Sequence, residues 1–316
     1  MRPSFLLKRT VASIGILFGV SIMVFGAIRL VPGDPVSLML GKSDQANPAL
    51  VAEFRRSYGL DDPLPIQYFR WVTHAISGDF GRSLDTGERV GDVLQRRLSA
   101  TLVLSSIAAV IALSVGLLWG VVAAYARGAI GAMLRSAPLV FMSVPPFAYG
   151  IALGYVLAVW LRLLPSSGMT SPVDGGGVLD VLHHAVLPAV TLAIIPASLT
   201  ARITAGTLDE LRHEDFVRTA LAAGIPERRV ALRHVLPNAL LPVVTNSGVL
   251  VGYMFTSAVL VEAVFSWPGV GTMMIHAVEN RDYPVLQAGA FIVASVFVLV
   301  NWVVDALYGI IDPRIR

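Results

Sequence analysis

The chain has 316 residues, of which 55% are hydrophobic and 14% are charged, with a formal net charge of +3 and no cysteine. Soluble globular domains carry roughly 25% charged residues, so this composition predicts an integral membrane protein. The missing cysteine excludes disulfides, thiolate metal sites and cysteine nucleophiles, and the small net charge does not indicate a nucleic-acid partner.

Six apolar stretches are long enough to cross a bilayer as helices, which takes about 20 residues. They are Thr10–Ile28, Leu98–Ala126, Ser136–Leu161, Val181–Ala201, His234–Val261 and Tyr283–Val304. None of them contains Lys, Arg, Asp or Glu. We therefore predict an all-α integral membrane protein with six transmembrane helices, the first within residues 1–31 and the other five within 98–316.

The first stretch resembles a secretory signal because Arg2, Lys8 and Arg9 precede it. A signal peptide has an apolar region of roughly 7–15 residues followed by a small-residue cleavage site. Here the apolar run has 19 residues and leads into Arg29-Leu30-Val31-Pro32. We expect it to be a retained transmembrane helix.

The positions of Lys and Arg predict the orientation, since cytoplasmic loops are enriched in both. If the N-terminus is cytoplasmic, the inner segments are 1–9, 127–135, 202–233 and 305–316, and they hold thirteen Lys and Arg residues. The short outer loops 162–180 and 262–282 hold two. Both termini are therefore expected in the cytoplasm.

Residues 32–97 form the one sizeable segment outside the membrane and are predicted to be a helical insert on the extracytoplasmic side. Asn47-Pro48 is typical of a helix start, and Gly59 of its end. A second helix is predicted after Asp62-Pro63, with Ile66, Phe69, Val72 and Ile76 near helical spacing. A segment this small is marginal as an independent domain, so we expect it to pack on the outer face of the helices.

Two features at membrane depth are candidates for a substrate pathway. Pro145-Pro146 interrupts the third stretch, and a broken helix within the bilayer is tolerated where it is buried or lines a cavity. Glu262 follows the fifth stretch and precedes Phe265–Gly271, so an outer vestibule is one location for it. The alternatives are a purely structural kink and an interfacial anchor.

The segment at about 205–237 is predicted to form two helices joined by a glycine turn. Val217, Ala220 and Leu221 lie on one face of the first helix. Gly224 occupies the position after the first helix, where a residue in the left-handed conformation commonly ends a helix. Glu227–His234 is predicted to form a second, short helix, and Pro237 lies at the start of the next span. Such a charged projection is suited to contact with a partner protein.

Nucleotide and metal sites are not predicted. Gly41-Lys42-Ser43 resembles a phosphate loop, but the required upstream glycine is replaced by Val36. His183-His184 makes a poor chelate, because neighbouring residues on a helix point about 100° apart. No pair of catalytic groups is apparent.

The 205–237 segment resembles the coupling loop of ABC importer permeases, whose pattern is EAA, three residues, Gly, nine residues and I-x-L-P. Gly224 matches the glycine and Leu236-Pro237 the closing pair, whereas Arg218, Thr219 and Ala220 occupy the EAA positions and His234 replaces Ile. Within that family, the chain looks like the dipeptide/oligopeptide/nickel group. The stretches that carry this likeness are RTALAAG, RLVPGDP (Arg29–Pro35), FSWPGVG (Phe265–Gly271), NRDYPV (Asn280–Val285) and DALYGIIDPRIR (Asp305–Arg316).

This resemblance implies the type I permease fold, a bacterial cytoplasmic-membrane location among lipids, and half of a pathway for di- or oligopeptides. It also implies a homologous second permease, two cytoplasmic ATPases that bind ATP and Mg²⁺, and an extracytoplasmic substrate-binding protein. The chain itself is then no enzyme and needs no cofactor or metal. The residues expected to contact the ATPases are Arg218, Thr219, Ala220, Gly224, Arg228, Arg229, Leu236 and Pro237.

Three alternatives stay open at this point. The same family imports nickel, glutathione or opines. Two alternatives come from other functional classes, namely a stand-alone secondary transporter and an intramembrane peptidase. The latter two require ion-binding or paired catalytic groups within the spans, and the sequence shows none.

Overall fold

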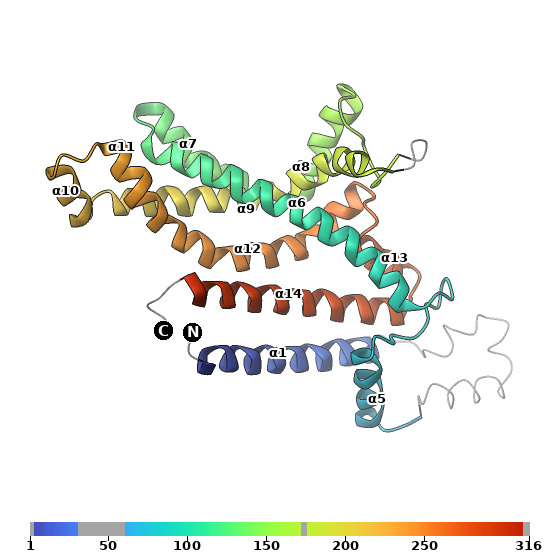
Figure 1. The fold of residues 1–316 in the computed structure, drawn as a ribbon. Helices are drawn as coiled ribbons and strands as arrows, with labels where there is room; N and C mark the ends of the chain where they lie inside the picture. The colour runs from blue at the N-terminus through green and yellow to red at the C-terminus, as the bar shows by residue number, and fades with distance from the viewer. Residues whose placement is uncertain (1–2, 31–60, 172–175, 312–316) are drawn as a thin grey trace.

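The computed structural model describes residues 3–30, 61–171 and 176–311, and this part of the chain is helical (Figure 1). The elements are α1 Pro3–Leu30, α5 Leu64–Ile76, α6 Val90–Tyr125, α7 Gly128–Met142, α8 Pro146–Leu153, the π-helical turn η1 Gly154–Trp160, α9 Val178–Leu211, α10 Asp215–Ala222, α11 Glu227–Val230, the π-helical turn η2 Ala231–Val235, α12 Leu236–Val264, α13 Val270–Glu279 and α14 Tyr283–Ile311.

Four helices are long and apolar enough to cross a membrane: Leu7–Ala27 within α1, all of α6, all of α9, and Tyr283–Ala306 within α14. A fifth span results if the bent pair Gly128–Met142 and Pro146–Trp160 counts as one. Within α12, the described stretch Gly252–Val264 is apolar but shorter. The structure thus bears out a helical membrane protein with four or five candidate spans, and the count of six stays a prediction.

The predicted break in the third span is confirmed. α7 and α8 meet at an angle of 101°, with Pro145 and Pro146 at the start of α8. Because proline has no backbone N–H, neither residue is able to donate the hydrogen bond that would continue α7. The phenol of Tyr149 donates to the carbonyl oxygen of Phe141 across the bend, at 3.0 Å.

The centre of the fold is the crossing of α6 and α9, and glycine makes their close approach possible. A Cβ atom on Gly116 would lie 2.6 Å from the Cβ of Thr200, and one on Gly120 would lie 2.5 Å from the Cβ of Thr204. Such distances exclude any larger residue unless the helices separate. Gly116 and Gly120, which are four residues apart on α6, therefore serve helix packing within the chain.

The predicted helix after Asp62-Pro63 is confirmed as α5, but a different face of it packs. Tyr68 and Ala75 are buried, whereas Ile66, Phe69 and Ile76 are exposed. The hydroxyl of Tyr68 lies 2.7 Å from that of Ser21 in α1. The contact partner, rather than the apolar spacing within α5, decides which side is buried. The predicted helix from Asn47 to Gly59 lies outside the described residues.

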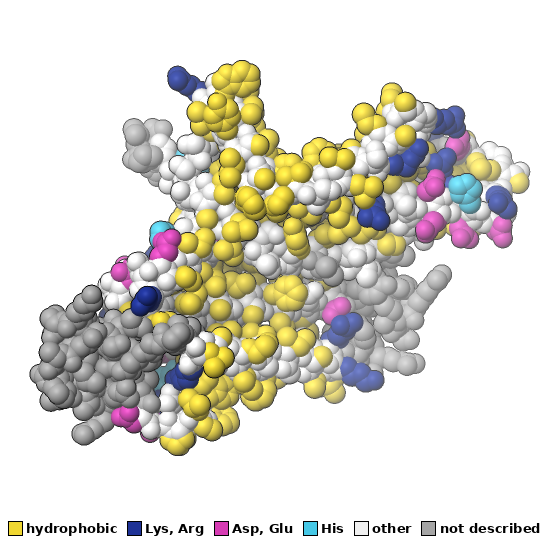
Figure 2. All heavy atoms as spheres, turned by 180° about the vertical axis from the view of Figure 1, so that it is seen from behind, with side chains coloured by type: hydrophobic (Ala, Val, Ile, Leu, Met, Phe, Trp, Pro, Cys, Tyr) yellow, Lys and Arg dark blue, Asp and Glu magenta, His cyan; other side chains and the backbone are white. Residues whose placement is uncertain are grey.

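The long helices run between two ends of the molecule. Figure 1 places α10, α11 and the beginning of α1 at one end, and α5 and α13 at the other. In Figure 2, apolar side chains cover the length of the helices, and charged side chains gather toward the ends. This is the surface expected of a protein that crosses a bilayer, since charge within the hydrocarbon layer is costly.

Candidate functional site

The segment 205–237 folds at the turn between α10 and α11 as the sequence predicts. Gly224 has φ +80°, the left-handed conformation that only glycine adopts easily. Its N–H donates to the carbonyl oxygen of Leu221 at 3.0 Å, and the N–H of Ile225 donates to that of Ala220 at 3.2 Å. These two bonds form a Schellman motif that ends α10 and turns the chain toward Pro226.

The inner face of this segment packs on the ends of α6 and α9. Val217, Val230 and Val235 are buried in a cluster with Ala124 and Leu208, and Ala220 is packed against it. Leu221, on the same face of α10, is 44% exposed, so the buried contact is made by Val217 and Ala220.

An arginine fastens the segment to the end of α6. Arg212 follows α9, and its guanidinium donates to the carbonyl oxygen of Ala124 at 2.8 Å. The same guanidinium lies 5.0 Å from the centre of the Tyr125 ring. A cation at the C-terminus of a helix is favourable, because the last carbonyl groups lack partners within the helix. The position of α10 is thereby tied to α6.

The opposite face of the segment is exposed and carries charge. Arg218, Thr219, Arg228 and Arg229 are exposed, and Arg218 lies 3.7 Å from Asp215. Two apolar side chains are exposed among them, Phe216 at 41% and Leu232 at 55%. Leu236 is half-buried and Pro237 is exposed at the start of α12. In place of a separate second helix, the helical winding continues from α11 through η2 into α12.

Glu262 lies at the other end of the molecule, and its side chain is fully buried. One carboxylate oxygen accepts the hydroxyl of Thr101 at 2.6 Å. The other accepts the N–H of Gly271 at 2.7 Å, in the first turn of α13. A carboxylate at this place satisfies N–H groups that a helix start leaves unpaired. These contacts join α12, α6 and α13.

Residues 265–271 connect α12 to α13 around the same carboxylate. Trp267 is fully buried, and its indole N–H donates to the carbonyl oxygen of Ala100 at 2.9 Å. A Cβ on Gly269 would lie 2.1 Å from a Glu262 carboxylate oxygen, and one on Gly271 would lie 2.3 Å from the Cα of Val259. The tryptophan and both glycines are therefore required by close packing.

The other two pathway candidates lie elsewhere. Pro145 is exposed and Pro146 half-buried at the break between α7 and α8. The Glu262 carboxylate accepts hydrogen bonds from α6 and α13, and these bonds do not involve Pro145 or Pro146. The role of all three residues in a pathway stays a prediction.

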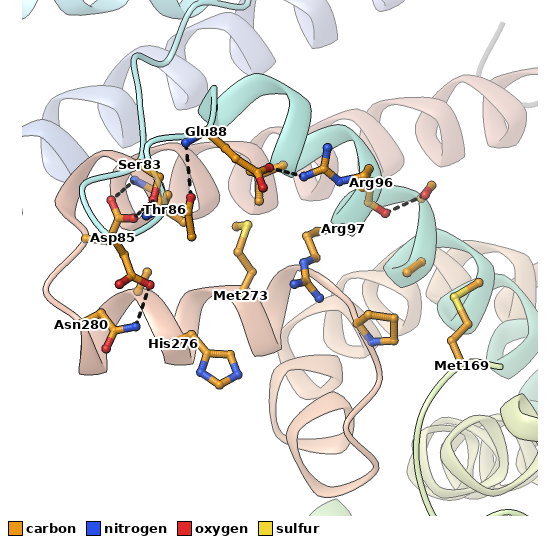
Figure 3. A pocket seen from close by; sticks show the side chains of 17 residues that line it. Ser83, Asp85, Thr86, Glu88, Arg96, Arg97, Met169, Met273, His276 and Asn280 are labelled. Atoms are coloured by element: carbon orange, nitrogen blue, oxygen red, sulfur yellow. Dashed lines mark hydrogen bonds and ion pairs between the residues drawn. The ribbon is translucent and has the colours of Figure 1, made fainter. Parts of the chain in front are cut away.

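A pocket of about 500 Å³ lies beside the Glu262 contacts, and we call it the α6–α13 pocket (Figure 3). One wall is the chain from Ser83 to Ala100, and the other is α13 with the residues that follow it. Arg97 extends from α6 toward α13 in this space. The sequence analysis did not name Arg97 as a candidate site residue, although its position directly before the apolar stretch that begins at Leu98 could have drawn attention to it.

Among the described residues, no three His, Asp or Glu side chains are close enough to hold an ion. His184 instead lies 3.1 Å from the carboxylate of Asp180, one helical turn earlier.

Comparison with known families and proteins identifies the relatives of the chain. Residues 116–316 match the model of the binding-protein-dependent transport system inner membrane component, and residues 2–108 match the N-terminal model of such membrane components. The di/tripeptide transport system permease protein DppB of Pseudomonas aeruginosa (strain UCBPP-PA14) is 41% identical, over 99% of this chain and 98% of that protein. The dipeptide permease protein DppB of Escherichia coli (strain K12) is 36% identical over the same shares.

A Gram-positive relative and a solved structure extend this picture. The oligopeptide transport system permease protein AppB of Bacillus subtilis (strain 168) is 35% identical, over 99% of each chain. The inward-facing MetNI methionine ABC transporter contains a chain with a TM-score of 0.54 and 15% identity, covering 70% of this chain and 96% of that one. The last comparison concerns the fold alone.

Proposed function

Because the chain belongs to the family of binding-protein-dependent transport system inner membrane components, we propose that it is a permease subunit of an ATP-driven importer of di- and oligopeptides. The observation that carries the proposal is the match, over nearly the whole chain, to permease proteins named for dipeptide, di/tripeptide and oligopeptide transport. Proteins of this family are bacterial membrane permeases and not enzymes.

The proposed importer contains four further components. A homologous second permease completes the pathway, two cytoplasmic ATPases bind ATP with Mg²⁺, and an extracytoplasmic binding protein delivers the peptide. The chain crosses the cytoplasmic membrane six times with both termini inside, and residues 32–97 lie outside. The asymmetry of Lys and Arg between the loops supports this orientation.

The 205–237 segment is the proposed contact with the ATPases. Its inner face is buried against α6 and α9, so a push on α10 is transmitted to long helices. Its exposed arginines beside Phe216 and Leu232 provide the charged and apolar groups that interfaces use.

A complementation experiment tests the function. A bacterium lacking its own peptide permeases is supplied with the complete importer, and uptake of a labelled dipeptide is measured. We expect uptake that requires this chain, the ATPases and the binding protein. Uptake that continues without the ATPases, or absent dipeptide uptake with all components present, would contradict the proposal. The purified chain alone is expected to show no saturable ATP binding.

A further inference from the structure

The α6–α13 pocket has the size and the lining of a ligand site. Ligand pockets measure roughly 300–1,000 Å³, and this one has about 500 Å³. Its floor is apolar, since Val93 and Met273 belong to a cluster of packed hydrophobic residues. Its rim is polar and contains acidic and basic groups (Figure 3).

Most charged groups around the pocket already have a partner. Asp85 accepts a hydrogen bond of 2.9 Å from Asn280, and Glu88 is paired with Arg96 at 2.5 Å. The hydroxyl of Ser83 donates to buried Asp282 at 2.5 Å. The contacts of Asp85 and Ser83 join the two walls, whereas Glu88 and Arg96 belong to the same wall.

Arg97 differs from its neighbour Arg96. Its side chain is half-buried in the pocket, and within the described part of the chain it has no hydrogen bond or ion pair. Arg97 interacts electrostatically with the carboxyl of Glu262, but the oxygens of that group accept hydrogen bonds from Thr101 and the start of α13 instead. The N–H groups of Arg97 therefore have no acceptor among the described residues and are free to bind an anion supplied from outside.

We propose that the α6–α13 pocket binds the cargo peptide through its C-terminal carboxylate, which Arg97 holds. A guanidinium presents parallel N–H groups that match the two oxygens of a carboxylate. Exposed Asp85, whose hydrogen-bond partner Asn280 is uncharged, gives the rim a negative group for the ammonium at the other end of a short peptide. The apolar floor makes contacts that discriminate little between side chains. This inference rests on the proposed function, since it takes the cargo to be a peptide.

Transport by the complete importer is the first test. We expect Arg97→Gln to lower kcat/KM for dipeptide uptake about tenfold, and Arg97→Lys to fall between it and the wild type. Arg70→Gln in α5 is the control, because Arg70 is 46% exposed, is paired with Asp62 on the surface and does not line the pocket, and its uptake is expected within about twofold of wild type. Association of the binding protein with each variant is measured in parallel and is expected to be unchanged.

Labelling of the pocket is the second test and needs no transport. The chain has no natural cysteine, so Ser99→Cys at the pocket wall provides a single thiol, with Val178→Cys as the distant control. In the assembled importer without binding protein, dialanine should slow the reaction of Cys at 99 with a maleimide several-fold and leave the control unchanged. Dialanine amide, which lacks the carboxylate, should not protect, and Arg97→Gln should abolish protection.

The two tests distinguish a failure of the Arg97 inference from a failure of the proposed function. Wild-type uptake in Arg97→Gln, or protection that persists in that variant, would overturn the inference and leave the peptide permease intact. Loss of binding-protein association in proportion to uptake would assign Arg97 to docking and would also overturn it. Failure of the wild-type importer to take up peptides would instead refute the proposed function.

Discussion

The hydroxyl of Thr101 in α6 donates to the carboxylate of Glu262 at 2.6 Å and accepts the N–H of Val270 at 2.8 Å. One side chain thus connects the end of α12 to the start of α13. The site is fully buried, so both hydrogen bonds are shielded from water. This geometry gives Glu262 a structural contact that the sequence did not predict.

We expect Thr101→Val and Glu262→Gln each to destabilise the protein, and the double variant to lose less than the sum. A buried hydrogen bond to a charged group contributes about 1.5–3 kcal/mol. Thr101→Val removes the donor, and Glu262→Gln removes the charge and replaces one of the two acceptor oxygens by an NH2 group, so both changes act on the same contact. The measurement is the free energy or midpoint of thermal unfolding in detergent for all four proteins. Additive losses would show that the two side chains act independently.

The same variants test the pathway role predicted for Glu262. If the carboxylate only holds α13, uptake by Glu262→Gln should change equally for acidic, neutral and basic dipeptides. A change that depends on cargo charge would assign the carboxylate to the pathway.

Gly271 is expected to tolerate no side chain. A Cβ there would approach the backbone Cα of Val259 to 2.3 Å, and backbone is unable to move aside as a flexible side chain does. Gly271→Ala should therefore lower the amount of folded protein several-fold, although alanine is the better helix former. Gly206→Ala in α9 is the control, since nothing lies within 4 Å of its Cβ position. Size-exclusion chromatography after membrane extraction measures both, and equal yields would contradict the expectation.

The sequence predicted the helices well because membrane spans depend on local composition. The break at Pro145-Pro146 and the left-handed Gly224 also follow from the residues themselves, through the missing N–H and the missing Cβ. The apolar stretches understated helix length, since α6 begins at Val90 and α9 continues to Leu211. Polar helical turns beyond the bilayer carry no hydropathy signal.

The contacts between distant residues could not be predicted in the same way. Thr101 and Glu262 are 161 positions apart, and neither residue type indicates the other. The buried face of α5 is set by Ser21 and Phe25 of α1, and the apolar spacing of α5, which indicated the helix, does not identify that face. For Arg97, what matters is the absence of a hydrogen-bond acceptor among the described residues, which a sequence does not show.

Cysteine labelling tests the orientation. Ala222→Cys in α10 is expected to react with an impermeant maleimide only from the cytoplasmic side, and Val178→Cys at the start of α9 only from outside. Val178 is 78% exposed, so a thiol there is accessible to the reagent. Labelling of intact cells at position 222 would invert the proposed topology.

Gly224→Val is expected to separate transport from folding. Valine in the left-handed conformation costs at least about 1–2 kcal/mol, and the position is open, with nothing within 4 Å of a Cβ. The strain therefore acts on the Schellman turn and on the angle between α10 and α11, whereas the long helices keep their packing. Near-normal amounts of the variant should reach the membrane, yet it should co-purify with little ATPase and support little uptake.

Controls identify the turn as the cause. Gly224→Asn should retain most activity, because asparagine adopts the left-handed conformation more readily than valine. Gly15→Val adds the same side chain to an open position in α1, outside the 205–237 segment, and should behave almost as wild type. Arg228→Gln with Arg229→Gln keeps the turn and removes exposed charge, so its defect should be milder and should vary with salt. Normal ATPase binding and uptake by Gly224→Val would show that this turn does not carry the contact, and that residues 205–237 form an ordinary surface loop.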